Sequence, residues 1–230
     1  MDAYGYCYQN PINLVDPDGR SAEDPGDIFS SDGRFLKNDG IDDKKVYVVD
    51  KDKIVTTEDG TKKWAVKDQI EIKGLTKDEL NLRASLATLK QAEAGRSNAP
   101  LDYNSWNNGD KFTEDSFLSN PTAYAEHPGK NPNSGSSAAG AYQALKRFYS
   151  GSDFSPQSQD KAAVKNMTSA SYKAALSGDM SSFKATTQAR WTSLEHWSVP
   201  ELQKTFYQNR ASELSGNSRI ATPIGKLLKN

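Results

Sequence analysis

The sequence predicts an α+β protein that is mainly α, in which a small β spacer precedes a helical domain. Short strand-like segments separated by charged turns lie between residues 46 and 72. Capped and periodic helical segments begin at residue 77. The charge changes at the same place, since residues 1–76 contain 11 Lys or Arg and 16 Asp or Glu, whereas residues 77–230 contain 18 and 14. We therefore expect three regions: a junction at 1–20, a linker and β spacer at 21–76, and the helical domain at 77–230.

The β spacer is predicted from the segments VYVV, KIVTT and WAVKDQIEI, which have the alternating pattern of half-buried strands. The Asp59-Gly60 dipeptide between them favours a hairpin, because glycine accepts the left-handed backbone that tight turns need. Upstream of these strands, residues 21–43 are rich in Asp, Gly and Ser, and this composition predicts a linker.

The first helix is predicted from Lys77 to about Ala94. Thr76 and Glu79 form a capping box at its start, and Gly95 is a natural stop. Further helices are predicted from SAAGAYQALKRFY (137–149), SPQSQDKAAVKNM (155–167) and SVPELQKTFYQNRASEL (198–214). The aperiodic residues 97–137 are expected to form a functional loop region, and residues 218–230 a loosely docked tail.

Glu93 is the first candidate for chemistry. Leu82, Leu86 and Leu89 recur at spacings of four and three, and continuing by four positions reaches Glu93. Burial and the negative end of the helix dipole both disfavour a carboxylate there, so its pKa is expected to be raised. A carboxyl that keeps its proton near neutral pH can act as a general acid. The alternative is a Glu93 that faces solvent because the helix frays before it.

The sequence contains few residues or motifs for other kinds of site. Two histidines and the single Cys7 do not build a typical zinc site, and no cofactor-binding fingerprint occurs, so neither a metal nor a cofactor is expected. No basic cluster interleaved with aromatics indicates a nucleic-acid partner. No apolar run is long enough for a membrane span, so membrane insertion is not expected. The N-terminal residues also lack the charged-then-apolar pattern of a signal segment.

Six segments, in order, resemble the lambda-like phage endolysins, which are lysozyme-like lytic transglycosylases of peptidoglycan. They are QAEAGR around Glu93, DKFTED, AEHP, SAAGAYQAL, DFSPQSQDKAA and ARWTSLEHW. The resemblance implies a lysozyme-like domain whose catalytic glutamate is Glu93. The chain departs from the family pattern at Ala141, at Glu114 and at Ala94-Gly95.

The same resemblance places His127, Tyr142 and Gln143 at positions that line the saccharide site. Asp102 and Tyr103 complete the set of candidate substrate-binding residues. Each has a plainer alternative: His127 could fix a loop, Tyr142 could belong to the core, and Gln143 could lie on a helix surface. Two further aromatic residues, Trp191 and Trp197, are expected to be core anchors.

Three functions follow from these residues. A lytic transglycosylase needs one carboxyl, Glu93, which protonates the MurNAc-GlcNAc bridge oxygen and then takes a proton from the muramyl C6 hydroxyl to give a 1,6-anhydro product. A hydrolytic muramidase would use Glu93 with Asp102 activating a water, as two-carboxylate glycosidases do. A member of another class, a non-catalytic module, would bind glycan strands without cutting them.

The opening segment YGYCYQNPINLVDPDGR resembles the closing segment of an Rhs/YD-repeat core, which joins a large β shell to a variable C-terminal toxin. This resemblance implies that the chain is the toxin part of a longer secreted effector acting in the periplasm of a target bacterium. Its expected partners are peptidoglycan glycan strands, the Rhs shell and a cognate immunity protein.

Overall fold

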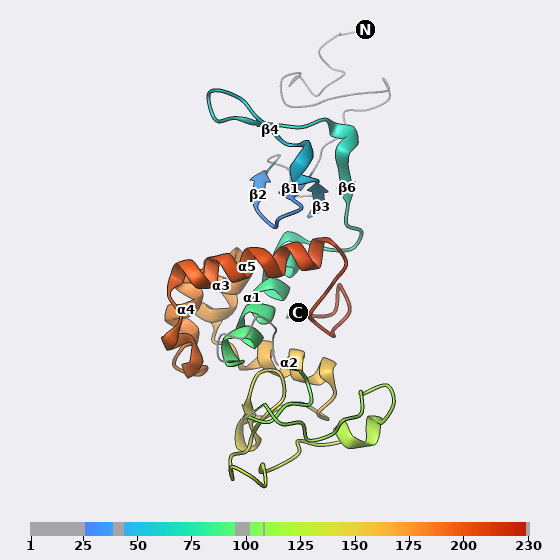
Figure 1. The fold of residues 1–230 in the computed structure, drawn as a ribbon, viewed down its shortest axis with the longest axis vertical. Coiled ribbons are helices and arrows are strands. Elements are labelled where there is room, and N and C mark those ends of the chain that lie inside the picture. The colour runs from blue at the N-terminus through green and yellow to red at the C-terminus, as the bar shows by residue number, and fades with distance from the viewer. Residues whose placement is uncertain (1–25, 39–43, 95–101, 108, 229–230) are drawn as a thin grey trace. The chain divides into compact units, whose positions relative to one another are not determined.

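The computed structural model describes residues 26–38, 44–94, 102–107 and 109–228 of the 230-residue chain. The chain divides into two compact units, Met1–Lys77 and Asp78–Asn230. Strands prevail in the first unit and helices in the second, which confirms the predicted α+β class (Figure 1). The junction predicted at residues 1–20 lies outside the described residues.

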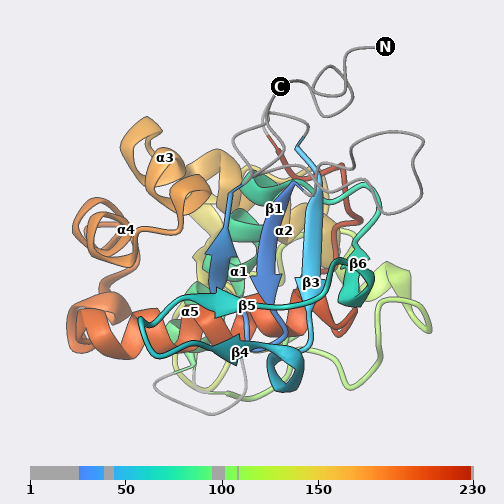
Figure 2. The same cartoon turned by 90° about the horizontal axis from the view of Figure 1, so that it is seen from above.

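The first unit contains a four-stranded sheet in the order β2-β1-β3-β6. Strands β1 and β3 run parallel and side by side, and the two outer pairs are antiparallel (Figure 2). A separate hairpin of β4 and β5 contains Gly60 at a φ of 82°, so the turn predicted at Asp59-Gly60 is confirmed. The strands are β1 (Asp27–Ser30), β2 (Phe35–Lys37), β3 (Val46–Val49), β4 (Val55–Thr56), β5 (Lys62–Lys63) and β6 (Gln69–Glu71).

Part of the predicted linker is an inner strand of this sheet. Strands β1 and β2 both fall within residues 21–43, so the linker prediction is wrong for residues 27–37. Ile28 and Phe29 are buried, and the ring of Phe29 meets that of Phe35 edge-on with centroids 5.5 Å apart. Turn-forming residues surround these strands, so the local sequence does not predict them. Strand β1 depends on its pairing with β3, which is a contact between segments distant in the sequence.

The described residues of the second unit form five α-helices, with α1 in the middle of the group (Figure 1). Leucines of α1 share one hydrophobic core with residues of α2 to α5, including Phe183 and Phe206. The helices are α1 (Lys77–Glu93), α2 (Pro156–Asn166), α3 (Ser169–Ser177), α4 (Met180–Thr187) and α5 (Val199–Leu214).

Two of the predicted helices begin at the caps that the sequence indicated. The Ser155 side chain accepts a hydrogen bond from the backbone N–H of Ser158 at the start of α2. Ser198 and Glu201 form a complete capping box at the start of α5. Helices α3 and α4 were not predicted, although each begins at a residue whose side chain caps it, Thr168 and Asp179.

Helix α1 is buried on every side, not along one stripe only. Leu82, Leu86 and Leu89 are fully buried as predicted, but every other residue from position 79 to position 92 is buried too. Arg83 illustrates how charge is tolerated there, since its Nε donates to Glu213 Oε2 at 2.6 Å. A buried charge is stable when it is paired and hydrogen-bonded.

The C-terminal tail is firmly docked, so the prediction of a loose tail is wrong for residues 218–228. Arg83 Nη1 donates to the carbonyl oxygen of Thr222 at 2.7 Å, and the N–H of Gly225 donates to the Glu79 carboxylate at 2.8 Å. Ile220 and Leu227 are buried in the core. The buried charges of α1 are therefore satisfied in part by tail backbone.

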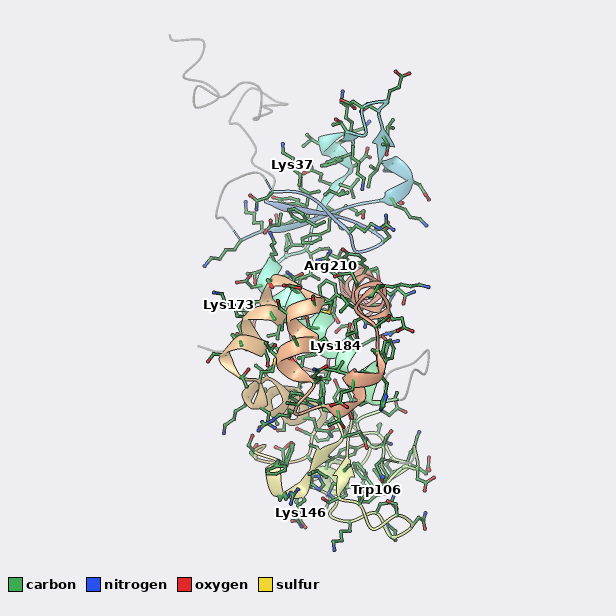
Figure 3. All side chains as sticks on the ribbon, turned by 90° about the vertical axis from the view of Figure 1, so that its left-hand side faces the viewer. Lys37, Trp106, Lys146, Lys173, Lys184 and Arg210 are labelled. Carbon is green, nitrogen blue, oxygen red and sulfur yellow. The ribbon has the colours of Figure 1, made fainter. Side chains whose placement is uncertain are left out.

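Residues 102–154, apart from residue 108, form a lobe of loops with one short hairpin (Figure 3). The labelled Trp106 and Lys146 lie in this lobe, whereas Lys173 and Lys184 lie on α3 and α4 (Figure 3). Its regular elements are β7 (Ala138–Ala139), β8 (Ala144–Leu145) and the 3-10 helices η4 (Pro121–Tyr124) and η5 (Lys146–Phe148).

The helix predicted over residues 137–149 is wrong, because a β hairpin and η5 occupy this segment. Gly140 has a φ of 75° and Gln143 a φ of 48°, and both values interrupt a right-handed helix. The backbone N–H of Ala141 donates to Gln159 Oε1 of α2 at 3.0 Å, so a side chain 18 positions away holds the turn. Alanine-rich composition favoured a helix, and tertiary contacts overrode it.

Candidate active site

Glu93 is the last residue of α1, and it is partly buried. Its Oε1 accepts a hydrogen bond from the hydroxyl of Ser193. Burial raises the pKa of Glu93 to about 7, and the hydrogen bond from Ser193 opposes part of that rise. The raised pKa predicted from the helix position is confirmed, and the alternative of a frayed, solvent-facing Glu93 does not apply. Near neutral pH this carboxyl can both give and take a proton.

Ser193 was not singled out by the sequence analysis. It lies in the 3-10 helix η6 (Thr192–His196), which begins directly after Trp191. Because Ser193 and Glu93 are 100 positions apart, no local pattern connects them. The signal that could have found Ser193 is its place in the ARWTSLEHW segment. Trp191 and Trp197 on either side of η6 are buried in the core, as predicted.

Tyr142 lies in the turn between β7 and β8 and is buried. Its hydroxyl donates to Asp160 Oδ1 at 2.7 Å, and its carbonyl oxygen accepts from the indole N–H of Trp191 at 3.2 Å. Burial, followed by the charge of Asp160, raises the pKa of the Tyr142 hydroxyl, which therefore stays protonated as a donor. These contacts fasten Tyr142, and the turn that contains it, to α2 and to Trp191.

Gln143 follows Tyr142 and carries an unsatisfied group. Its Nε2 donates to the carbonyl oxygen of Gly140 at 2.8 Å. Its Oε1 is buried and has no hydrogen-bond partner within the described residues. A buried amide oxygen without a donor is costly, by about 1–3 kcal/mol. Such an atom is suited to accept a hydrogen bond from a ligand N–H.

His127 is buried in the lobe, and both of its ring nitrogens contact backbone. The N–H of Gly129 donates to Nδ1 at 3.1 Å, so Nδ1 is unprotonated and Nε2 carries the hydrogen that faces the carbonyl oxygen of Ala144 at 2.8 Å. Burial lowers the pKa of His127. Its ring centroid lies 4.6 Å from that of Phe154. His127 thereby links the backbone at Gly129 to strand β8 within the lobe, next to Gln143.

Asp102 and Tyr103 are neighbours in sequence but differ in environment. The Asp102 side chain is 70% exposed, and its partner is Lys111 at 3.9 Å. Tyr103 is partly buried, and its hydroxyl donates to Asp160 Oδ1 at 2.8 Å. Lys90 Nζ lies 3.8 Å from the centre of the Tyr103 ring. Of the predicted site residues, Tyr103 and Tyr142 are thus brought together at Asp160, whereas Asp102 pairs with Lys111.

Lys90 lies one turn before Glu93 on α1 and is buried. Its Nζ donates to the carbonyl oxygen of Arg219 at 2.8 Å. Burial lowers the pKa of Lys90 to about 8, and the nearby carboxylates of Asp160 and Asp102 oppose the decrease. The end of α1 that carries Glu93 is therefore anchored by charge-assisted contacts with the tail.

The described residues contain no group of three or more His, Cys, Asp and Glu side chains that could hold a metal ion. Within the same residues, every helix is too short or too polar to cross a membrane.

Comparison with known proteins bears on the same part of the chain. The model of the Endolysin family matches residues 83–212, which make up more than half of the chain and include Glu93, Ser193 and all the predicted site residues. Neither the curated proteins nor the solved structures include a match.

Proposed function

Since the chain belongs to the endolysin family, which points to an enzyme that degrades peptidoglycan, we propose that it is a lytic transglycosylase whose general acid and base is Glu93. The observation that carries this proposal is the carboxyl of Glu93, whose pKa burial raises to about 7. An acid-base group is most effective when its pKa lies near the working pH.

The reaction requires one carboxyl in two successive roles. Protonated Glu93 gives its proton to the bridge oxygen as the bond between that oxygen and the MurNAc anomeric carbon breaks, and the GlcNAc end leaves with a free hydroxyl. The muramyl C6 hydroxyl then bonds to the anomeric carbon and returns its proton to Glu93. The product is a 1,6-anhydro sugar, and no water is consumed. Ser193 holds one carboxyl oxygen in place during both steps.

The surroundings of Glu93 favour this route over hydrolysis with Asp102. The pKa rise of Glu93 comes from burial and is opposed by the Ser193 hydrogen bond, and no second carboxylate contributes among the described residues. A second carboxylate close to the acid adds to such a rise even where burial is its main cause. Asp102 instead lies exposed next to Lys111.

Substrate binding is assigned to the turn that follows β7. The unpaired Oε1 of Gln143 would accept the N–H of a sugar acetamido group, which satisfies both partners. His127 supports this turn through its contact with Ala144. Tyr103 and Tyr142 support the site indirectly, because both hydroxyls donate to Asp160. Asp102, which is exposed, is available to the polar parts of a glycan strand.

A Glu93→Gln variant tests whether the domain is an enzyme or a non-catalytic glycan-binding module. The substitution keeps the shape of the side chain and removes its transferable proton. Purified sacculi incubated with the wild type should release soluble muropeptides, and sacculi incubated with the variant should release none. Equal release by both proteins would contradict the role of Glu93, and binding to sacculi without release by either would favour the binding module.

The biological setting is proposed on the resemblance of residues 4–20 to an Rhs junction, and those residues lie outside the described part of the chain. We expect a toxin that is carried by an Rhs shell and acts in the periplasm of a target bacterium. Its producer then needs an immunity protein that blocks Glu93. Co-expression of the chain with the product of the adjacent reading frame, followed by affinity purification and a sacculus digestion assay, tests this. Absence of both binding and inhibition would count against it.

A further inference from the structure

We propose that Asp160 and Tyr142 are positioning residues for the reaction, which hold Glu93 through a path of contacts that continues through Trp191 and Ser193. This inference rests on the proposed function of Glu93 and deepens it. It assigns a task to a buried carboxylate that the reaction itself does not use.

Asp160 is the starting point of the path. It lies on α2, is fully buried, and accepts four hydrogen bonds from three different segments of the chain. Oδ1 receives the hydroxyls of Tyr142 at 2.7 Å and Tyr103 at 2.8 Å, while Oδ2 receives the backbone N–H of Thr222 at 2.9 Å and its hydroxyl at 3.1 Å. A buried carboxylate with this many donors fixes the segments that supply them.

Tyr142 connects Asp160 to the start of η6. Its hydroxyl is fixed by Asp160, and its own carbonyl oxygen accepts the indole N–H of Trp191 at 3.2 Å. Trp191 is the residue from which η6 begins, and Ser193 lies in the first turn of η6. Because Ser193 donates to Glu93, the orientation of the carboxyl depends on where this turn is held.

The residue next to Asp160 holds the same turn from a second side. Gln159 Oε1 accepts the N–H of Ala141 at 3.0 Å, and Gln159 Nε2 donates to the carbonyl oxygen of Tyr103 at 2.9 Å. Gly140 packs so closely here that a Cβ would lie 2.1 Å from Gln159 Oε1. Helix α2 therefore holds the turn at both Ala141 and Tyr142, the residues that precede the left-handed Gln143.

The alternative is that Asp160 serves stability alone, and a pair of matched variants separates the two roles. Tyr142→Phe removes one hydroxyl from Asp160 on the path to Glu93. Thr222→Val removes another hydroxyl from the same carboxylate, but on the tail, away from that path. Both should lower the midpoint of thermal unfolding by similar amounts, since each deletes one buried hydrogen bond.

Their effects at Glu93 should differ. We expect Tyr142→Phe to lower kcat on sacculi by about tenfold with little change in KM, because the lost positioning affects the chemical step. Thr222→Val should keep kcat within about twofold. Trp191→Phe cuts the same path at its next contact and should reproduce the Tyr142→Phe result, which provides a second test if one variant folds poorly.

An NMR titration of the carboxyl carbon of Glu93 in the intact chain provides a readout that does not need activity. Displacing Ser193 removes a donor that favours the charged form, so Tyr142→Phe and Trp191→Phe should raise the titration midpoint of Glu93, and Thr222→Val should leave it unchanged. An unchanged midpoint and unchanged kcat in the path variants would overturn the proposal. A wild type that titrates as expected but releases no muropeptides would contradict the proposed function instead, while the midpoints would still decide the positioning role.

Discussion

The hydroxyl of Ser193 donates a hydrogen bond to Oε1 of Glu93, although the two residues are 100 positions apart. This contact joins the end of α1 to η6, and it involves Oε1 of the two carboxyl oxygens of Glu93. Burial and this hydrogen bond act on the pKa of Glu93 in opposite directions, and burial prevails.

Replacing Ser193 with alanine should make Glu93 a weaker acid. Loss of the donor removes an interaction that favours the carboxylate, so the pKa of Glu93 rises further above its present value of about 7. The alkaline limb of the pH-rate profile should therefore move to higher pH, and kcat should decrease because the carboxyl is less well oriented. Rates of sacculus digestion between pH 5 and pH 9 measure both effects. Ser150→Ala, at an exposed position, serves as the control, and an identical profile for Ser193→Ala would contradict the prediction.

Glu93→Gln should stabilise the protein at alkaline pH. A carboxyl whose pKa is raised in the folded state contributes stability below its unfolded pKa of about 4.5, and this contribution is lost as the pH rises through about 7. Glutamine resembles the protonated form at every pH. Urea unfolding should therefore give equal stabilities near pH 4 and an advantage of roughly 1–3 kcal/mol for Glu93→Gln near pH 8. A stability advantage of Glu93→Gln that is the same at both pH values would contradict the assignment.

His127 should make the lobe sensitive to acid. Burial lowers its pKa in the folded state, so its contribution to stability is complete above the unfolded pKa of about 6.5 and is lost as the pH falls through the folded value. Protonation would also direct an Nδ1 hydrogen at the N–H of Gly129. His127→Gln should thus lose less stability than the wild type when the pH is lowered from 7.5 to 5, as measured by thermal unfolding. A His127→Gln variant that is as acid-sensitive as the wild type would argue against this assignment.

Gly140→Ala should disturb the turn that carries Tyr142 and Gln143. Its φ of 75° disfavours an L-residue, and the added Cβ would lie 2.1 Å from Gln159 Oε1. Gly109→Ala is a matched control, because Gly109 has a φ of 87° but no atom within 4 Å of the new Cβ. Both variants carry the backbone cost of about 1–2 kcal/mol. Only Gly140→Ala should lose a further ~1 kcal/mol or more of stability, together with most of its activity. Equal losses in urea unfolding would show that the close contact with Gln159 is not limiting.

The sequence predicts helices well where local signals and long-range packing agree. The capped starts of α2 and α5 and the leucine spacing of α1 are of this kind. The segment 137–149 has helix-forming composition, but the left-handed Gln143 and the bond from Ala141 to Gln159 depend on a distant helix. Strand β1 was missed for the same reason, because it is stabilised by pairing with β3, which is distant in the sequence.

The candidate site shows the same division. Glu93 follows from helical spacing and from the resemblance of QAEAGR, because both are local properties. Ser193 and Asp160 could not be assigned from spacing, since their roles depend on contacts between segments 100 and 18 positions apart. For Tyr142 the sequence left two alternatives, a residue that lines the saccharide site and a residue of the core. Its contacts with Asp160 and Trp191, which indicate a supporting role, are visible only in the structure.

The most direct test of the central claim, that Glu93 alone supplies and recovers the proton, is the mass of the products. Purified sacculi digested to completion by the wild type should give muropeptides that are one water lighter than the products of a hydrolytic muramidase, with no reducing end at MurNAc. Products that carry a reducing MurNAc and incorporate oxygen from labelled water would contradict the single-carboxyl mechanism and assign the activity to hydrolysis.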